Sequence, residues 1–263
     1  MVKRNEIEIT NTEIRHKKLP RSFDGYRIVQ VSDLHDSQFG EGQKDLLDKI
    51  RKAAPDMIAL TGDFIGEKDS DWRKMLRFMN ELPAIAPCFY ITGNHEYRLS
   101  EEDLKNFLKG IEDCGVCVLG NRTVRVQRDE EDIQIVGVDD PAKVGEGHRP
   151  MDENQMRKEL READFDREQF NLLLTHRPEL LNIYAEEGAD VVLCGHSHGG
   201  QLRLPLIGAF YVPSQGWFPK YDCGLFEEKG TKMYISRGLG CSVVQFRWNC
   251  PPELAVVTLR NIV

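Results

Sequence analysis

Residues 191–200 read VVLCGHSHGG, in which an apolar run meets two glycine-flanked histidines that are one residue apart. A short apolar run that ends abruptly in polar residues is typical of a buried strand leading into a turn. Four other stretches follow the same pattern, and we expect a strand in each: YRIVQVSD (26–33), DMIALTGD (56–63), CFYITGNH (88–95) and FNLLLTHR (170–177).

Helix-like segments follow three of these strands. QKDLLDKIRKAA (43–54) and SDWRKMLRFMNEL (70–82) repeat apolar residues at three- and four-residue spacing, which is typical of an amphipathic helix. A third segment, EEDLKNFLKGIEDCG (101–115), begins after Ser100, a good N-cap residue, and ends at a glycine. This alternation of strand and helix predicts an α/β fold.

Strands without an intervening helix are expected at both ends of the chain. KMYISRGLG (232–240) and ELAVVTLRNIV (253–263) read as strands, and NEIEITNTEI (5–14) alternates in part. We expect these segments at antiparallel sheet edges or in a second sheet, with residues 1–20 forming an edge strand and lead-in. The polar segment 139–155 is interpreted as a surface loop, and the whole chain, 1–263, as a single domain.

Composition and charge exclude several classes of function. The 263-residue chain carries a net charge of −8, which repels polyanions, so we expect no nucleic-acid partner. No apolar run is long enough for a signal peptide or a membrane span. Seven cysteines at scattered positions argue against a disulfide framework, and we interpret the CGVC at 114–117 as two reduced, half-buried thiols. We therefore expect a cytoplasmic protein.

The polar ends of the five predicted strands supply metal-binding side chains. Residues beyond the carboxyl ends of strands in an open α/β sheet converge on one site, however distant they are in sequence. Five of the seven histidines lie at these ends, whereas His16 and His148 do not. Carboxylate, imidazole and carboxamide groups together suit Mn, Fe, Zn or Ni. The strand-end set is Asp33, His35, Asp63, Asn94, His95, His176, His196 and His198.

The motifs SDLH, TGD, GNHE, THRP and GHSHGGQ, in this order and each at a strand end, resemble those of the calcineurin-like metallophosphoesterase superfamily. The match runs from about residue 26 to the C-terminus. Two further stretches are similar to the YkuE/YaeI-type bacterial phosphodiesterases: SQGWFPKYDCGLFE (214–227) and SRGLGCSVVQFRWNCPPELAVVTLR (236–260). The resemblance implies a four-layer αββα sandwich of two mixed sheets flanked by helices, with a dinuclear metal site at the C-terminal ends of strands.

The resemblance also implies a role for each strand-end residue. Three of them would bind the first metal: Asp33, His35 and His198. Three others would bind the second: Asn94, His176 and His196. Asp63 would bridge both metals, and His95 would stay off the metals as the proton donor. Members of this branch often carry an N-terminal membrane anchor or export signal, and this chain begins without either.

The chemistry of such a site follows from general principles. Two metals roughly 3.5–4 Å apart can hold a bridging water, lower its pKa and clamp the phosphoryl oxygens. Asp63 would keep the cations close together, Asn94 would add a neutral oxygen, and His95 would protonate the leaving alkoxide. We therefore predict a binuclear metal-dependent phosphoesterase that hydrolyses phosphodiesters by in-line attack of a metal-bridging hydroxide.

Two alternatives stay open at this point. The first is a pyrophosphatase that acts on a nucleotide-linked lipid of the UDP-diacylglucosamine type, with Trp217 and Phe218 holding acyl chains. For these two rings, however, we expect packing in the core or at its rim. The second is a non-catalytic scaffold, although such proteins typically lose ligands that this chain keeps. The expected partner is a small-molecule phosphodiester, and a membrane surface becomes a partner only if the substrate is a lipid.

Other polar residues near the motifs are weaker candidates. Arg98 and Arg177 are placed to touch a substrate phosphate, although arginines near strand ends usually form surface ion pairs. Glu96 either orients the imidazole of His95 or is a solvated residue. His148 is interpreted as a solvated loop residue.

Overall fold

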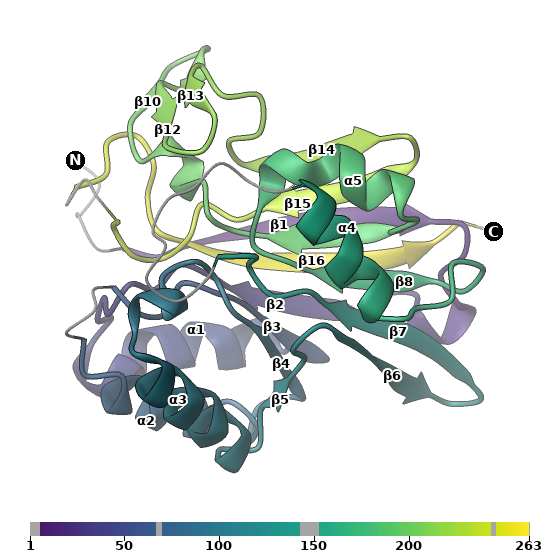
Figure 1. Cartoon of the computed structure of the whole chain (residues 1–263), viewed down its shortest axis with the longest axis horizontal. Coiled ribbons are helices and arrows are strands. Elements are labelled where there is room, and N and C mark those ends of the chain that lie inside the picture. The colour runs from purple at the N-terminus through teal and green to yellow at the C-terminus, as the bar shows by residue number, and fades with distance from the viewer. Residues whose placement is uncertain (1–5, 67–69, 143–152, 243–245, 263) are drawn as a thin grey trace.

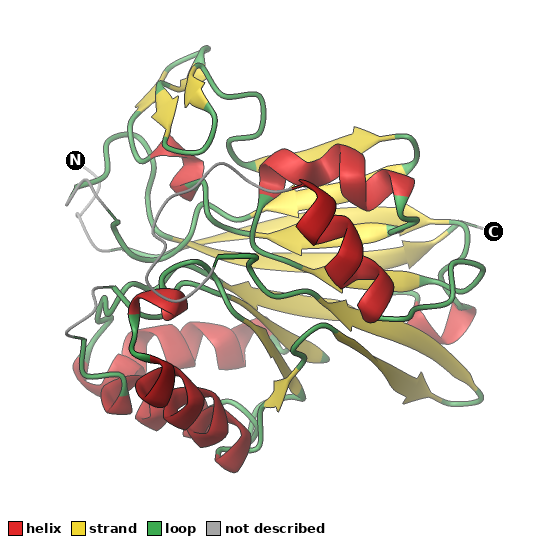
Figure 2. Cartoon of the chain, viewed as in Figure 1, coloured by secondary structure: helices red, strands yellow, loops and turns green. Residues whose placement is uncertain are grey.

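Two six-stranded sheets lie face to face, with helices on the outer side of each (Figure 1, Figure 2). This arrangement is seen in a computed structural model, which describes residues 6–66, 70–142, 153–242 and 246–262. The four layers form the αββα sandwich that the resemblance implies. His148 and most of the predicted loop at 139–155 lie outside the described residues.

The first sheet is mixed. Its four strands β2 to β5 are parallel, β16 is antiparallel to β2, and β1 is parallel to β16. Across the sheet the order is β1 (Glu8–His16), β16 (Glu253–Asn261), β2 (Arg27–Val31), β3 (Met57–Thr61), β4 (Cys88–Ile91) and β5 (Cys117–Val118).

The second sheet is also mixed. Strands β15, β9, β8 and β7 are parallel, and an antiparallel strand closes each edge. Across the sheet the order is β14 (Gly224–Glu228), β15 (Thr231–Ile235), β9 (Val191–Cys194), β8 (Asn171–Leu174), β7 (Glu131–Gly137) and β6 (Arg122–Arg128).

Short elements complete the chain. In the part of the chain that the structure describes, five helices flank the sheets: α1 (Lys44–Ala53), α2 (Arg73–Glu81), α3 (Glu101–Asp113), α4 (Glu153–Glu162) and α5 (Leu181–Glu186). The same described ranges contain five 3-10 turns: η1 (Arg21–Phe23), η2 (Glu41–Gln43), η3 (Glu96–Arg98), η4 (Pro178–Leu180) and η5 (His198–Gly200). Two small hairpins project beside η5, formed by β10 (Arg203–Leu204), β11 (Gly208–Ala209), β12 (Tyr211–Val212) and β13 (Gly216–Trp217).

The alternation of side chains along each strand produces three apolar layers between the four structural layers. In β2, Val29 and Val31 pack with helices α1 to α3, whereas Ile28 faces the other sheet. In β9, Leu193 belongs to the layer between the sheets, and Val192 packs with α4 and α5. Because the central strands are buried on both faces, they read as the continuous apolar runs of the sequence.

The five predicted core strands are confirmed, as are the three predicted helices. Ser100 caps α3, since its hydroxyl accepts a hydrogen bond of 3.1 Å from the backbone N–H of Asp103. The expectation for the terminal strands is confirmed only in part. β1 is an edge strand, but it pairs in parallel, and β16 lies inside the first sheet because β1 covers it.

Candidate metal centre

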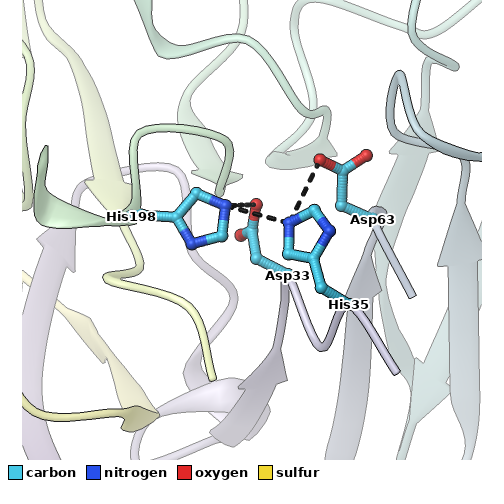
Figure 3. Close-up of side chains that lie close together, drawn as sticks. All are labelled: Asp33, His35, Asp63 and His198. Carbon is cyan, nitrogen blue, oxygen red and sulfur yellow. Dashed lines mark hydrogen bonds and ion pairs between the residues drawn. The ribbon is translucent and has the colours of Figure 1, made fainter. Parts of the chain in front are cut away.

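The candidate site lies where loops from the two sheets meet. Loops after β2, β3 and β4 approach from the first sheet, and loops after β8 and β9 approach from the second. Each of the eight strand-end side chains is buried, with an exposure of 8% or less. Figure 3 shows four of them gathered around one point: Asp33, His35, Asp63 and His198.

The backbone at these loop positions is in the left-handed region. Five non-glycine site residues have φ between 44° and 69°: Asp33, His35, Asp63, His196 and His198. Only a few per cent of non-glycine residues adopt this conformation, and Asp and His tolerate it better than most. It costs on the order of 1–3 kcal/mol per residue, and such strain concentrates at functional sites. The reversal after each strand turns the ligand side chains toward the junction of the sheets.

Two glycines allow the ligand loops to approach each other closely. A Cβ on Gly195, just before His196, would lie 2.2 Å from Oδ2 of Asp33. A Cβ on Gly93, just before Asn94, would lie 2.3 Å from Oδ1 of Asp63. The GHSH and GNHE turns can therefore pack against the two carboxylates only because these positions have no side chain.

The first donor group consists of Asp33, His35, Asp63 and His198, which each offer one ligand atom within 4.8 Å of the others. Nε2 of His35 lies 2.9 Å from Nε2 of His198 and 3.6 Å from Oδ2 of Asp63. Nε2 of His198 is 3.4 Å from Oδ1 of Asp33. Two imidazoles and two carboxylates that converge in this way are typical ligands of a divalent transition metal.

The second donor group consists of Asp63, His176 and His196. The ring nitrogen Nδ1 of His176 donates to the carbonyl of Thr61 at 2.8 Å, so Nε2 carries the lone pair. That Nε2 lies 3.2 Å from Oδ2 of Asp63. Asp63 therefore belongs to both donor groups, as expected of a bridging ligand.

Two buried atoms at this second group lack a hydrogen bond. They are Nε2 of His176 and Oδ1 of Asn94. Both are lone-pair donors, and leaving such a group buried without a partner costs free energy. A cation held beside Asp63 would satisfy both atoms. The residues present therefore fit a pair of metal ions, and the donor set suits Mn, Fe, Zn or Ni.

Burial keeps most of the site imidazoles neutral. It lowers the pKa of His35 to about 3 and lowers the pKa values of His196 and His198 well below the usual range. A metal binds the neutral form of histidine, so these rings do not need to lose a proton at physiological pH.

The pKa values of Asp33, Asp63 and His176 are also shifted, but nearby charges contribute to these shifts as well as burial. Burial raises the pKa of Asp33 to about 6. Burial also opposes the charged forms of Asp63 and His176, but their mutual attraction outweighs it. This attraction lowers the pKa of Asp63 well below its usual range and raises that of His176 to about 10. Asp63 and His176 thus form a buried ion pair, and a cation held beside Asp63 would take the place of the proton on Nε2 of His176.

His95 lies next to both donor groups but belongs to neither. Its Nδ1 donates to the carbonyl of Gly66 at 2.6 Å, and its Nε2 lies 3.9 Å from Oδ2 of Asp63. Its ring packs edge-on against His35, with 4.3 Å between the ring centroids. The ring is therefore fixed in position with Nε2 turned toward the site.

Glu96 corrects the sequence interpretation. It is fully buried, so it is not solvated, and the hydrogen bonds of its carboxylate go to backbone groups rather than to the imidazole of His95. Instead it accepts hydrogen bonds from the backbone N–H groups of Asp63, Phe64 and Gly93 at 3.0, 2.7 and 2.8 Å. Glu96 ties the loop that carries Asp63 to the loop that carries Asn94.

Arg177 lies behind the metal centre. Its side chain is buried and forms an ion pair with Asp140, with Nη2 at 3.2 Å from Oδ1. Its Nη1 donates to Nε2 of His196 at 2.9 Å. Arg98 is on η3 and donates to the carbonyl of Gly66 at 3.2 Å. Arg177 is thus a buried partner of Asp140 and His196, rather than one of the surface ion pairs that arginines near strand ends usually form.

Two residues near the site, Asp140 and Arg247, are not among those predicted from the sequence. Asp140 ends the segment IQIVGVDD (133–140), which follows the same pattern of an apolar run with a polar end and could have been found by it. Arg247, whose Nη2 lies 3.3 Å from Nδ1 of His198, is within the stretch 236–260 but outside the strand-end motifs. Its position depends on the tertiary fold.

The remaining predictions concern residues away from the metal centre. His16 is on β1 and lies 3.6 Å from Asp190. Cys114 and Cys117 are half-buried and free, as expected. The packing predicted for Trp217 and Phe218 is wrong: their exposures are 65% and 61%, because the hairpin that carries them projects from the sandwich.

A cavity opens onto the metal centre. Its lining combines polar and apolar side chains. The polar ones include Asp63, Asn94, His95, His196 and His198, and the apolar ones include Leu202, Phe210, Tyr211 and Pro213.

A model of the calcineurin-like phosphoesterase family matches residues 26–200. The chain belongs to this family. Among relatives of this calcineurin-like phosphoesterase, the metallophosphoesterase YkuE of Bacillus subtilis is 29% identical over 97% of this chain and 86% of its own length. The phosphodiesterase YaeI of Escherichia coli is 30% identical over 89% of this chain and 82% of its own length.

Solved structures share the fold at low sequence identity. A phosphopantetheinyl hydrolase from Mycobacterium tuberculosis superposes with a TM-score of 0.52 at 12% identity, covering 82% of this chain and 91% of the other. TT1561 of Thermus thermophilus gives a TM-score of 0.51 at 14% identity, covering 82% and 90%. Among the described residues of this phosphoesterase, no helix combines the length and the apolar character needed to cross a membrane.

Proposed function

We propose that this phosphoesterase hydrolyses phosphodiesters with the help of two metal ions. The observation that carries the proposal is the position of Asp63, a buried carboxylate shared by two donor groups. One ion would be held by Asp33, His35 and His198, and the other by Asn94, His176 and His196. When bound, the two ions supply Lewis acidity toward the phosphoryl oxygens and lower the pKa of a water to near neutrality for in-line attack.

His95 is the proton donor in this proposal. A carbonyl oxygen only accepts hydrogen bonds, so the contact with Gly66 places a proton on Nδ1 and leaves Nε2 to exchange the second proton. His95 lines the cavity at the metal centre, where the leaving oxygen of a substrate would lie, and its Nε2 is 3.9 Å from Oδ2 of Asp63. From this position the imidazolium can protonate the leaving alkoxide as the ester bond breaks.

The charge of the site favours a diester over a monoester. Two divalent cations and two carboxylates leave a charge of about +2, and an attacking hydroxide reduces it to about +1. A diester anion balances this charge of the ions and their ligands, whereas a monoester dianion exceeds it and would need a further cation, such as the His95 imidazolium or Arg247. Arg177 does not offset a dianion, because it is already paired with Asp140. The name of the relative YaeI, a phosphodiesterase, supports the same substrate class.

The apolar part of the cavity lining favours one alternative. Leu202, Phe210 and Tyr211 line the same cavity as the metal ligands, as a pyrophosphatase of a nucleotide-linked lipid would require. A non-catalytic scaffold is disfavoured, because the complete donor set is assembled and buried.

We also propose a cytoplasmic location, supported by seven cysteines that are all free. Fractionation of the source cells would test the location.

The proposed function is tested by metal reconstitution. The protein is stripped, reloaded separately with Mn, Fe, Zn or Ni, and assayed on bis(p-nitrophenyl) phosphate, p-nitrophenyl phosphate and UDP-diacylglucosamine. We expect the highest kcat/KM for the diester. A higher value for the monoester would contradict the diester assignment, and turnover of the nucleotide-lipid alone would support the alternative. Inactivity with every metal would favour a scaffold.

A further inference from the structure

A charge-free segment follows directly after the metal-binding turn. Residues 204–219, LPLIGAFYVPSQGWFP, contain no Asp, Glu, Lys or Arg, in a chain in which 30% of residues are charged. The segment forms most of the two small hairpins that project from the sandwich (Figure 1). It begins just beyond residues 26–200, which the family model matches. The segment thus lies outside the part of the chain that the family model matches.

Large apolar side chains of this segment are exposed. Leu206 is fully exposed at 108%, and Ile207, Trp217 and Phe218 are exposed at 63%, 65% and 61%. Soluble proteins rarely expose a large contiguous apolar patch unless it contacts something else. We call these side chains, together with the two that line the cavity, the apolar platform: Leu206, Ile207, Phe210, Tyr211, Trp217 and Phe218.

The apolar platform has a defined structure. Phe210 packs edge-on against Trp217 and Phe218, with ring centroids 4.8 and 5.6 Å apart. The backbone N–H of Phe218 also donates to the carbonyl of Phe210 at 3.0 Å. At its base, the carboxylate of Asp222 accepts hydrogen bonds from Arg203 and from the backbone N–H of Ala209 at 2.8 and 3.0 Å. The exposed rings are therefore presented by a hydrogen-bonded scaffold.

The apolar platform is attached to the metal-binding turn. Ser197, between the two histidines of the GHSH motif, donates to the backbone carbonyl of Asp222. A Cβ on Gly200 would lie 2.5 Å from Cβ of Ala209, so the turn and the hairpin are in close contact. Phe210 and Tyr211 line the cavity and also contact Trp217. An apolar surface thus continues from the cavity wall to the outside of the protein.

The chemistry of the apolar platform fits a lipid surface better than a protein partner. Protein interfaces have a polar rim with direct hydrogen bonds, but the polar side chains of this segment are few. Gln215 uses both ends of its amide on the backbone of Tyr221, at 2.7 and 3.0 Å. Aromatic and branched aliphatic side chains, by contrast, suit the interfacial region of a bilayer. Lys220, the first charged residue after the segment, is already paired with Glu228 at 3.6 Å, so we expect the docking to depend on apolar contacts rather than on charge.

We propose that the apolar platform docks on the surface of a lipid bilayer and presents the cavity to a phosphodiester carried by a lipid. Leu206, Ile207, Trp217 and Phe218 enter the interfacial region, and the apolar residues that line the cavity receive the part of the lipid next to the phosphate. The lipid substrate rests on the proposed function, whereas the docking does not.

Vesicle flotation of the full chain tests the docking. The probes are phosphatidylcholine vesicles with and without phosphatidylglycerol. We expect the wild type to float with vesicles and the double variant Leu206→Glu/Ile207→Glu to bind at least about tenfold more weakly, since two buried apolar side chains are lost from the interface. The matched control is Leu225→Glu on β14, which changes an exposed leucine outside the apolar platform and should bind like the wild type.

Three measurements keep the outcomes distinct. Thermal unfolding shows that each variant is folded, and activity on bis(p-nitrophenyl) phosphate should be unchanged in the double variant, because neither residue lines the cavity. Failure of the wild type to bind either vesicle, or equal loss in Leu225→Glu, would overturn the docking. Sedimentation tests the remaining alternative, a second copy of the chain. The docking would also be overturned if the wild type self-associates without binding vesicles and the double variant no longer self-associates. Vesicle binding without any phosphoesterase activity would leave the docking standing and reject the proposed function.

Discussion

The metal centre and the apolar platform lie side by side. The metal centre buries polar side chains, whereas the apolar platform exposes apolar ones. At the metal centre, Asp33 and His176 have no exposed surface, whereas Leu206 on the apolar platform is fully exposed. Buried polar groups and exposed apolar patches are the informative exceptions in a folded protein. The contrast shows that one functional region can be recognised by its buried polar side chains and the neighbouring region by its exposed apolar side chains.

The two regions also differ in what holds them. The metal centre is built from loops of both sheets, and Glu96 ties two of these loops together through backbone hydrogen bonds. The apolar platform is held mainly by contacts within its own hairpins and by Asp222. A change at the metal centre should therefore affect chemistry and stability, whereas a change on the outer platform should affect only binding to lipid.

The largest effect is expected for Asp63→Ala. This change removes the one ligand shared by both donor groups and leaves the repulsion between the two cations uncompensated. Metal content should fall below two ions per chain, and turnover of a diester should fall by at least about three orders of magnitude. Elemental analysis measures the metal content, and the variant Asp48→Ala, which changes an exposed aspartate, is the control. Two tightly bound ions in folded Asp63→Ala protein would show that Asp63 is not the bridge.

His95→Asn is expected to separate chemistry from metal binding. His95 lies outside both donor groups, so the variant should keep its metals but lose roughly two to four orders of magnitude in turnover. The loss should be smallest for an aryl ester, whose leaving group needs little protonation. An alkyl ester hydrolysed at the wild-type rate would exclude His95 as the acid.

Glu96→Gln tests how the ligand loops are held. The amide has one acceptor oxygen and an N–H₂ group, which cannot accept the backbone hydrogen bonds that the second carboxylate oxygen receives. We expect the free energy of unfolding to fall by about 1–3 kcal/mol and turnover to fall less than in His95→Asn. Urea denaturation and the diester assay measure the two effects. Wild-type stability in this variant would mean that the loops are held by other contacts.

The core strands, the helices and the residues that gather at the candidate metal centre could be predicted because they depend on local patterns, whereas the four-layer arrangement and the ligand roles came from the resemblance. Each ligand follows an apolar run, and parallel strands bring such ends together. The role of Glu96 was not predictable, since a buried glutamate that binds distant backbone looks like a solvated one in sequence. The pairing of Arg177 with Asp140 likewise requires the two strands to be placed first. Trp217 looked like a core residue because composition does not reveal which side of a hairpin meets solvent.

The smallest effect is expected for Leu206→Ser. A leucine that makes almost no contact contributes little to folding, so the free energy of unfolding should change by less than about 0.5 kcal/mol. The matched variant Leu193→Ala, in the fully buried layer between the sheets, should cost about 2–5 kcal/mol. Urea denaturation compares the two. A loss above about 1 kcal/mol in Leu206→Ser would mean that this side chain is packed in solution, for example against a second copy, and the contrast between the two regions would fail. A negligible loss would mean that Leu206 does not contribute to the stability of the fold. Contact with lipid is then the reason that we propose for an exposed leucine at this position.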